Sequence, residues 1–162
     1  MSAEQTTSGP PKLDSQAVSR IATAVEIENV ELVGSHYERE DDTPSPVALH
    51  VDETPRIRIG LEWEVHHPLL VVVASFATVF DVEPQPYSIV ARFRLTYQLD
   101  TEDPPDPADV EQFAHWNAMF NAWPYWREFV ASTINRGQLP RFVVPVMGVP
   151  RTAPGSGPGS SP

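Results

Sequence analysis

The chain of 162 residues has no cysteine. Disulfide frameworks, thiolate zinc sites and cysteine nucleophiles are therefore excluded. Long apolar runs are also missing, because the longest one, residues 69–74, is far too short to cross a bilayer. Residues 1–14 lack the apolar core of a signal peptide. We therefore expect a cytoplasmic protein that does not associate with membranes.

Basic residues are scarce. Eleven Lys and Arg residues face 22 Asp and Glu residues, which gives a formal net charge of -11 and a pI near 4.7. A surface of this charge repels phosphate backbones and anionic lipid headgroups, so nucleic acids and membrane surfaces are poor partners. Polypeptides with basic or apolar segments fit better.

Catalytic motifs are missing as well. There is no glycine-rich phosphate loop, no HExxH and no GxSxG. His66 and His67 are neighbours on an expected strand, so they point to opposite faces and cannot ligate one ion. We interpret His115 as a surface or core histidine, and Glu62 and Glu64 as the solvated face of a strand. The sequence thus predicts a non-enzymatic protein with no metal and no cofactor.

Both ends are rich in polar residues, proline and glycine. Residues 1–14 and 150–162 cannot bury enough apolar surface to offset the entropy lost on ordering. We expect both to be disordered tails, which leaves residues 15–149 as a single domain.

The first expected strand begins near residue 22 and changes its pattern along its length. Val25 and Ile27 have one parity, whereas Val30 and Leu32 have the other. An extra residue near position 28 would produce this slip, so we predict a β-bulge there.

Three further strands follow. Residues 56–66 alternate strictly between apolar and polar side chains, as do residues 89–99. Residues 69–82 are apolar on both parities, which predicts a central strand covered on both faces. A long connection, up to residue 55, separates the first strand from the second and is expected to be functional or mobile.

Two helices are expected after the strands. Asp106 is a suitable N-cap with Pro107 at the first helical position. We expect Pro124 to break the helix, a second helix to follow, and Gly137 to act as its C-terminal cap. An extended apolar segment, residues 139–149, ends the domain. Strands followed by helices indicate an α+β fold.

The second helix carries a motif that resembles a known family. Residues 124–128 read PYWRE, and residues 136–140 read RGQLP. This arrangement is similar to the second-helix signature of SecB-type chaperones, close to PYAREx(n)SRGxxPxL, and the likeness extends over residues 22 to about 147. The motif positions, for which we expect packing and assembly roles, are Pro124, Tyr125, Arg127, Glu128, Arg136, Gly137 and Pro140.

The resemblance implies a four-stranded antiparallel sheet with two helices, assembled as a dimer of dimers, that binds non-native polypeptide in apolar grooves without nucleotide. An edge strand and aromatic-rich helices also need a partner to cover them, so we expect a homotetramer. The groove is expected between the long connection and second strand on one side, and the second helix and following segment on the other. Its expected residues are Val47, Leu49, Val51, Trp63, Phe129, Leu139, Phe142 and Val144.

The leading hypothesis is an ATP-independent holdase that binds unfolded polypeptides along an apolar groove and a strand edge. Its clients would be exported proteins, with the SecA translocase motor as a further partner, or one aggregation-prone protein such as an antitoxin. The alternative is a partner-specific adaptor without general chaperone activity. An enzyme with a site in an α+β cleft is disfavoured because no catalytic constellation is present.

Overall fold

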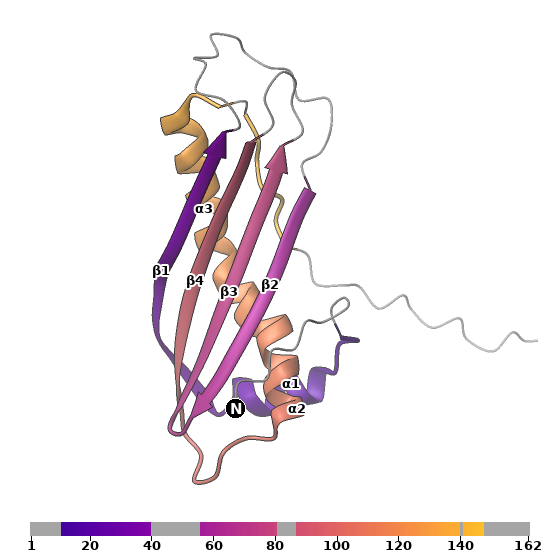
Figure 1. The fold of residues 1–162 in the computed structure, drawn as a ribbon. Coiled ribbons are helices and arrows are strands. Elements are labelled where there is room, and N and C mark those ends of the chain that lie inside the picture. Colours follow the sequence, from indigo (N-terminus) through magenta and orange to yellow (C-terminus); the bar gives the residue numbers. More distant parts are fainter. Residues whose placement is uncertain (1–10, 40–55, 81–86, 140, 148–162) are drawn as a thin grey trace, which may run out of the picture.

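One antiparallel sheet carries all the helices on one of its faces (Figure 1). The structure is a computed structural model that describes residues 11–39, 56–80, 87–139 and 141–147. The elements are α1 (Ser15–Ala22), β1 (Val25–Arg39), β2 (Arg56–His66), β3 (Leu69–Phe80), β4 (Tyr87–Leu99), α2 (Pro107–Phe113), the π-helical turn η1 (Ala114–Ala118) and α3 (Met119–Gly137). The expected α+β fold, with a four-stranded antiparallel sheet followed by helices, is confirmed.

The strand order is β1-β4-β3-β2, so β3 and β4 are central and β1 and β2 are the edges. Along β3, alternate residues are buried under the helices and the others are only half-buried. The expectation that β3 is covered on both faces is therefore wrong for the single chain. On the open face, Arg92 of β4 reaches Glu62 of β2 at 3.2 Å and Arg94 reaches Glu31 of β1 at 2.7 Å. Arg92 and Arg94 pair in register with Ser75 and Val73, so they lie on the same face as the half-buried residues of β3.

The predicted bulge in β1 is confirmed by a register shift between Ile27 and Asn29, and a second shift lies between Leu32 and Gly34. Because of the first shift, the apolar residues on either side of it face the same way. Ile27 pairs with Tyr97 and Leu32 with Phe93, and both β4 partners are buried under the helices. The bulge thus keeps one apolar face along a long edge strand.

Residues 107–137 form one continuous helical run. Asp106 caps it as predicted, because its side chain accepts a hydrogen bond from the Ala108 amide at 2.8 Å. The predicted break at Pro124 is wrong, because α3 continues through Pro124. The irregular turn is η1, which ends at Ala118, before α3 begins. Pro124 and Phe120 are both exposed, so water can satisfy the Phe120 carbonyl that Pro124 leaves without a helical donor.

The end of α3 also differs by one residue from the prediction. Gly137 is the last helical residue, and the left-handed cap is Gln138, with φ 51°. A Cβ on Gly137 would lie 3.1 Å from Cγ of Leu139, which is buried. A side chain at position 137 would therefore require Leu139 to shift by a few tenths of an ångström, and the backbone of Gly137 is not in the left-handed region.

The N-terminal helix α1 is absent from the sequence-based expectation. Asp14 caps it by accepting from the Gln16 and Ala17 amides. Gln112 of α2 accepts from the Asp14 amide and donates to the Lys12 carbonyl. Lys12 and Asp14, which we expected in a disordered tail, are thus attached to the fold. Residues 1–10 and 150–162 lie outside the described residues.

Aromatic contacts hold α3 and α2 on the central strands. Phe76 of β3 stacks on Trp126 with 5.5 Å between ring centroids and meets Trp123 edge-on at 5.7 Å. Near the start of the helical run, Tyr97 of β4 meets Phe113 of α2 edge-on at 5.1 Å. Such pairs contribute about 0.5–1.5 kcal/mol each beyond their buried area. The core therefore lies between α3 and the middle of the sheet.

Candidate functional site

The helix-side face of β2 is apolar and only partly covered. Its residues are Ile57, Ile59, Leu61, Trp63 and Val65, and we call this row the β2 flank. Ile59 is 43% exposed and the rest are half-buried. Within the described residues no strand pairs with the outer edge of β2. An apolar row beside free backbone donors and acceptors is the arrangement that β-strand addition requires.

A hollow of about 340 Å³ lies where the β2 flank meets the loop before α2. It is lined by Trp63, Val65, His67, Pro104, Pro105, Pro107 and Val110. Trp63 also meets His115 of η1 edge-on, with 5.7 Å between ring centroids. His115 is buried and its Nδ1 donates to the Glu111 carbonyl at 3.0 Å, so its ring is fixed. The residues that line the hollow are apolar except for His67.

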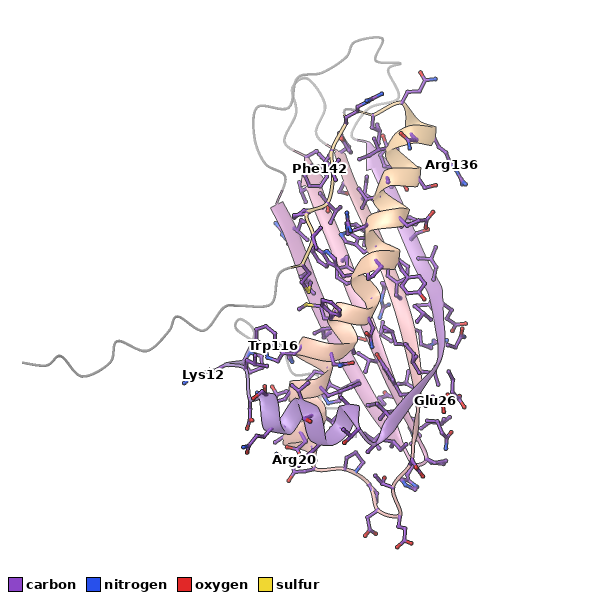
Figure 2. All side chains as sticks on the ribbon, turned by 180° about the vertical axis from the view of Figure 1, so that it is seen from behind. Lys12, Arg20, Glu26, Trp116, Arg136 and Phe142 are labelled. Atoms are coloured by element: carbon purple, nitrogen blue, oxygen red, sulfur yellow. The ribbon has the colours of Figure 1, made fainter. Side chains whose placement is uncertain are left out.

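Residues 141–147, which we call the strap, run back along α3 over β3 and β2 (Figures 1 and 2). Phe142 meets Phe80 edge-on at 5.4 Å, and Val144 is only 3% exposed. Two side chains of α3 hold the backbone. Arg127 Nε donates to the Val144 carbonyl at 3.1 Å, and Trp123 Nε1 donates to the Pro145 carbonyl at 2.9 Å.

The opposite edge has a second exposed apolar surface, the β1 flank. It comprises Ile27, Leu32 and Tyr37 of β1, all exposed, together with Tyr125 of α3. Tyr125 is 47% exposed, and its ring lies 6.3 Å from that of Phe93, the register partner of Leu32. Exposed apolar side chains that gather in this way mark interaction surfaces.

The predicted groove residues separate into three groups. Val47, Leu49 and Val51 lie outside the described residues. Trp63 and Phe142 are half-buried on the β2 side of α3, whereas Leu139 and Val144 are buried in the core. Phe129 follows Asn121 and Tyr125 at i, i+4 spacing, so these three residues share one side of α3. Asn121 and Tyr125 contact residues of β4. Phe129 therefore lies on the β4 side of the helix, away from the strap. A client role for these residues stays a prediction.

The motif residues have different surroundings. Arg127 holds the strap, Tyr125 belongs to the β1 flank and Gly137 packs against Leu139. Pro124, Glu128 and Arg136 are exposed, and Pro140 lies outside the described residues. Trp123 is one of the helix aromatics expected mainly in the core, and it is buried. Its hydrogen bond to the strap was not expected, although its spacing of four from Arg127 places two N–H donors on one helix row.

Among the titratable groups that the structure describes, Tyr97 has a large pKa shift. Burial raises the pKa of Tyr97 to about 12, and this effect outweighs the hydrogen bond from Asn121, which lowers the pKa. His66 contacts Glu64 at 2.9 Å, and His67 contacts the Thr101 carbonyl. No three His, Asp or Glu side chains among the described residues could hold one metal ion. None of the helices described is long and apolar enough to span a bilayer.

Comparison with known proteins supports the fold alone. No family model and no curated protein matches the sequence. Among solved structures, the chain is similar to the Rv1957 SecB-like chaperone of Mycobacterium tuberculosis, with a TM-score of 0.70 and 18% sequence identity. That structure is a complex with a ChAD peptide from the Rv1956 HigA1 antitoxin. The match covers 82% of this chain and 97% of that one. A protein of unknown function from Streptococcus agalactiae has a TM-score of 0.46 at 11% identity, over 75% and 96%. The chain thus has the fold of a SecB-like chaperone.

Proposed function

We propose that this protein is a non-enzymatic, ATP-independent holdase of the cytoplasm that binds unfolded polypeptides. The observation that carries the proposal is the β2 flank, where a half-exposed apolar row lies beside a strand edge that is unpaired in the described chain. The fold shared with a chaperone solved with a bound peptide supports a polypeptide ligand.

Binding would combine two kinds of contact. The backbone of an extended client adds to the free edge of β2, which supplies hydrogen bonds regardless of sequence. Alternate client side chains then lie against Ile59 and its neighbours, and a large one enters the hollow beside Trp63. Such binding shields the client from aggregation because it removes apolar surface from water, and it needs no nucleotide.

The charge of the chain favours basic clients. A formal charge of -11 raises the local concentration of polypeptides with Lys and Arg beside their apolar segments. Salt screens this attraction, with a Debye length of about 8 Å at physiological ionic strength. Client binding is therefore expected to weaken as salt is added.

A narrower function is the protection of one dedicated client, such as an antitoxin. The structural neighbour is described with an antitoxin peptide, and this favours a dedicated client over general export through the SecA motor. A partner-specific adaptor of this kind would bind one protein and ignore generic unfolded chains. A panel of unrelated unfolded clients separates the two functions.

The β1 flank is our proposed site of self-assembly into a homotetramer. Its apolar side chains lie on the edge strand opposite the client flank, together with Tyr125 of the motif helix. A second copy packed there would cover both the exposed side chains and the β1 edge, with which no described strand pairs.

The test is light scattering of a chemically unfolded client, without nucleotide and at two salt concentrations. We expect suppression of aggregation at equimolar tetramer, weaker suppression at high salt, and a several-fold loss on Ile59→Asp. Gly60→Asp is the matched control, because it adds the same charge on the opposite face, where a Cβ meets only Ser75 at 3.7 Å. No suppression by the wild-type protein, or equal loss in both variants, contradicts the proposal.

A further inference from the structure

The strap is attached in the way that a bound peptide is attached. Its backbone is extended but belongs to no strand, and no backbone–backbone hydrogen bond joins it to the described parts of the chain. Its polar contacts with the described residues are made by two carbonyls, which Trp123 and Arg127 hold. An element of the core would normally satisfy its backbone through a ladder or a helix.

The side chains of the strap alternate as those of an extended ligand do. Phe142 and Val144 point inward to the core, and Met147 packs partly against it. Val143 and Val146 point outward and are 78% and 75% exposed. Pro145 between them is also exposed, so the outer face of the strap is apolar.

The seat beneath the strap recognises backbone rather than sequence. The Arg127 and Trp123 donors bind two consecutive carbonyls, which every polypeptide carries. Beside them, Phe80 and the core around Val144 accept apolar side chains at alternate positions. Any extended chain with apolar residues at i and i+2 presents the same chemistry.

We propose that the strap is an internal occupant of the client site, and that an extended apolar client displaces it from α3. The proposal rests on the proposed holdase function and adds where part of the client binds and what competes with it. Leu139 is buried and its amide bonds to the Ile134 carbonyl at 3.1 Å, so it anchors the chain before the strap begins. Exchange can therefore occur beyond Leu139 without unwinding α3.

Competition of this kind lowers the apparent affinity for clients. If the strap occupies its seat in about nine of ten molecules, client binding is about tenfold weaker than to an empty seat. In return, the apolar seat is not left open in the free protein, where it would promote association between copies. Weakening the strap without changing the seat should therefore increase affinity.

Two neighbouring valines give a matched pair of full-length variants. Val144→Ser weakens the buried contact of the strap, whereas Val143→Ser changes a side chain that is exposed. The probes are fluorescent, reduced and carboxymethylated lactalbumin as an unfolded chain, and a labelled peptide with the sequence of residues 140–149. We expect Val144→Ser to bind both probes about tenfold more tightly than the wild type, and Val143→Ser to bind as the wild type does.

Three outcomes are decisive. If Val144→Ser binds the peptide no more tightly than the wild type, the strap is not a displaceable occupant. If Val143→Ser loses affinity while Val144→Ser gains none, the outer face of the strap contacts the client and the proposal is wrong. If the peptide binds Val144→Ser tightly but no variant binds lactalbumin, the strap proposal stands and the general holdase function fails.

A measurement on the wild-type protein does not depend on how well Val144→Ser folds. Nuclear Overhauser contacts between the rings of Phe142 and Phe80, whose centroids lie 5.4 Å apart, report whether the strap occupies its seat. Addition of unfolded lactalbumin should remove these contacts if the client displaces the strap. Contacts that persist while the client is bound would overturn the proposal.

Discussion

At the scale of single residues, Tyr97 connects β4 to both α2 and α3. Its ring meets Phe113 edge-on, and its hydroxyl accepts a hydrogen bond from Asn121 Nδ2 at 3.2 Å. The residue is almost fully buried, and burial raises its pKa to about 12. The phenol therefore stays neutral in the folded state at pH values where an unfolded tyrosine ionises.

Substitution of Tyr97 tests the raised pKa of its phenol, through the stability of the protein at alkaline pH. Between pH 10 and 12 the unfolded state loses the Tyr97 proton while the folded state keeps it, so the free energy of unfolding falls as pH rises. The expected loss from this group is about 1.4 kcal/mol at pH 11. Tyr97→Phe should be about 1 kcal/mol less stable at pH 7.5, because it loses one hydrogen bond, but should lose less stability on going to pH 11. Urea unfolding at both pH values measures the difference, and equal losses in the two proteins would contradict it.

Arg127 illustrates how much of a residue's role a motif can predict. The PYWRE pattern placed it on the right helix, where packing was expected. Its contact, the Val144 carbonyl, is 17 residues away on a segment with no regular structure. Periodicity reports which residues share a helix face, whereas a contact with an irregular segment depends on the path of the chain after the helix.

At the scale of elements, the attachment of α1 to α2 is electrostatic on its outer side. Arg20 binds Asp109 through Nε at 2.7 Å and Nη2 at 2.6 Å. The hydrogen bond from Arg20 lowers the pKa of the Asp109 carboxyl. A lowered carboxyl pKa means that the pair stabilises the fold above the ordinary pKa of aspartate, and that this contribution is lost as pH falls through the lowered value.

Removal of this pair should release α1 selectively. Asp109→Asn keeps the shape of the side chain but loses the charge, so we expect faster amide exchange in Ser15–Ala22 while the sheet amides are unchanged. Asp103→Asn, in the loop before α2, is the charge-matched control and should leave α1 protected. If α1 exchanges at the wild-type rate in Asp109→Asn, then Gln112 and apolar packing alone hold it.

The elements differ in how far the sequence predicts them. The four strands and the bulge follow from alternation, because the change of parity after Ile27 is visible in the residues themselves. The helix α1 was missed because it has eight residues, of which only Ala17 and Ile21 are buried, and two apolar positions are too few to show a helical periodicity. A helix this short depends on its packing against α2 for stability. The turn η1 has no pattern of its own, so Pro124 was the only visible candidate for a break.

At the scale of the whole molecule, the sheet has two unlike edges. The β2 edge has the strap and the hollow beside it, and the β1 edge has exposed Leu32 and Tyr125. The sheet face away from the helices carries the Arg92–Glu62 and Arg94–Glu31 pairs. Because that face is charged and solvated, the proposed contacts with clients and with other copies are expected at the two flanks.

The assembly prediction is tested on the β1 flank. The wild-type protein should sediment with four times the mass of one 18.0 kDa chain. Leu32→Asp places a charge in the proposed interface and should give smaller species, whereas Asn29→Asp, with the same charge change on the opposite face of β1, should not. A wild-type mass of 18.0 kDa, or equal dissociation in both variants, would refute the assignment.

The attachment of the strap also has a direction. Arg127 holds the Val144 carbonyl and Trp123, one turn earlier on α3, holds that of Pro145, so the strap runs antiparallel to the helix. A client that replaces the strap on the same two donors, in the same order, is expected to have the same polarity. Its N-terminal side then leaves the protein near Arg136, and its C-terminal side leaves toward Trp116 (Figure 2). We therefore expect clients to bind in one direction, with a peptide of reversed sequence as the weaker ligand.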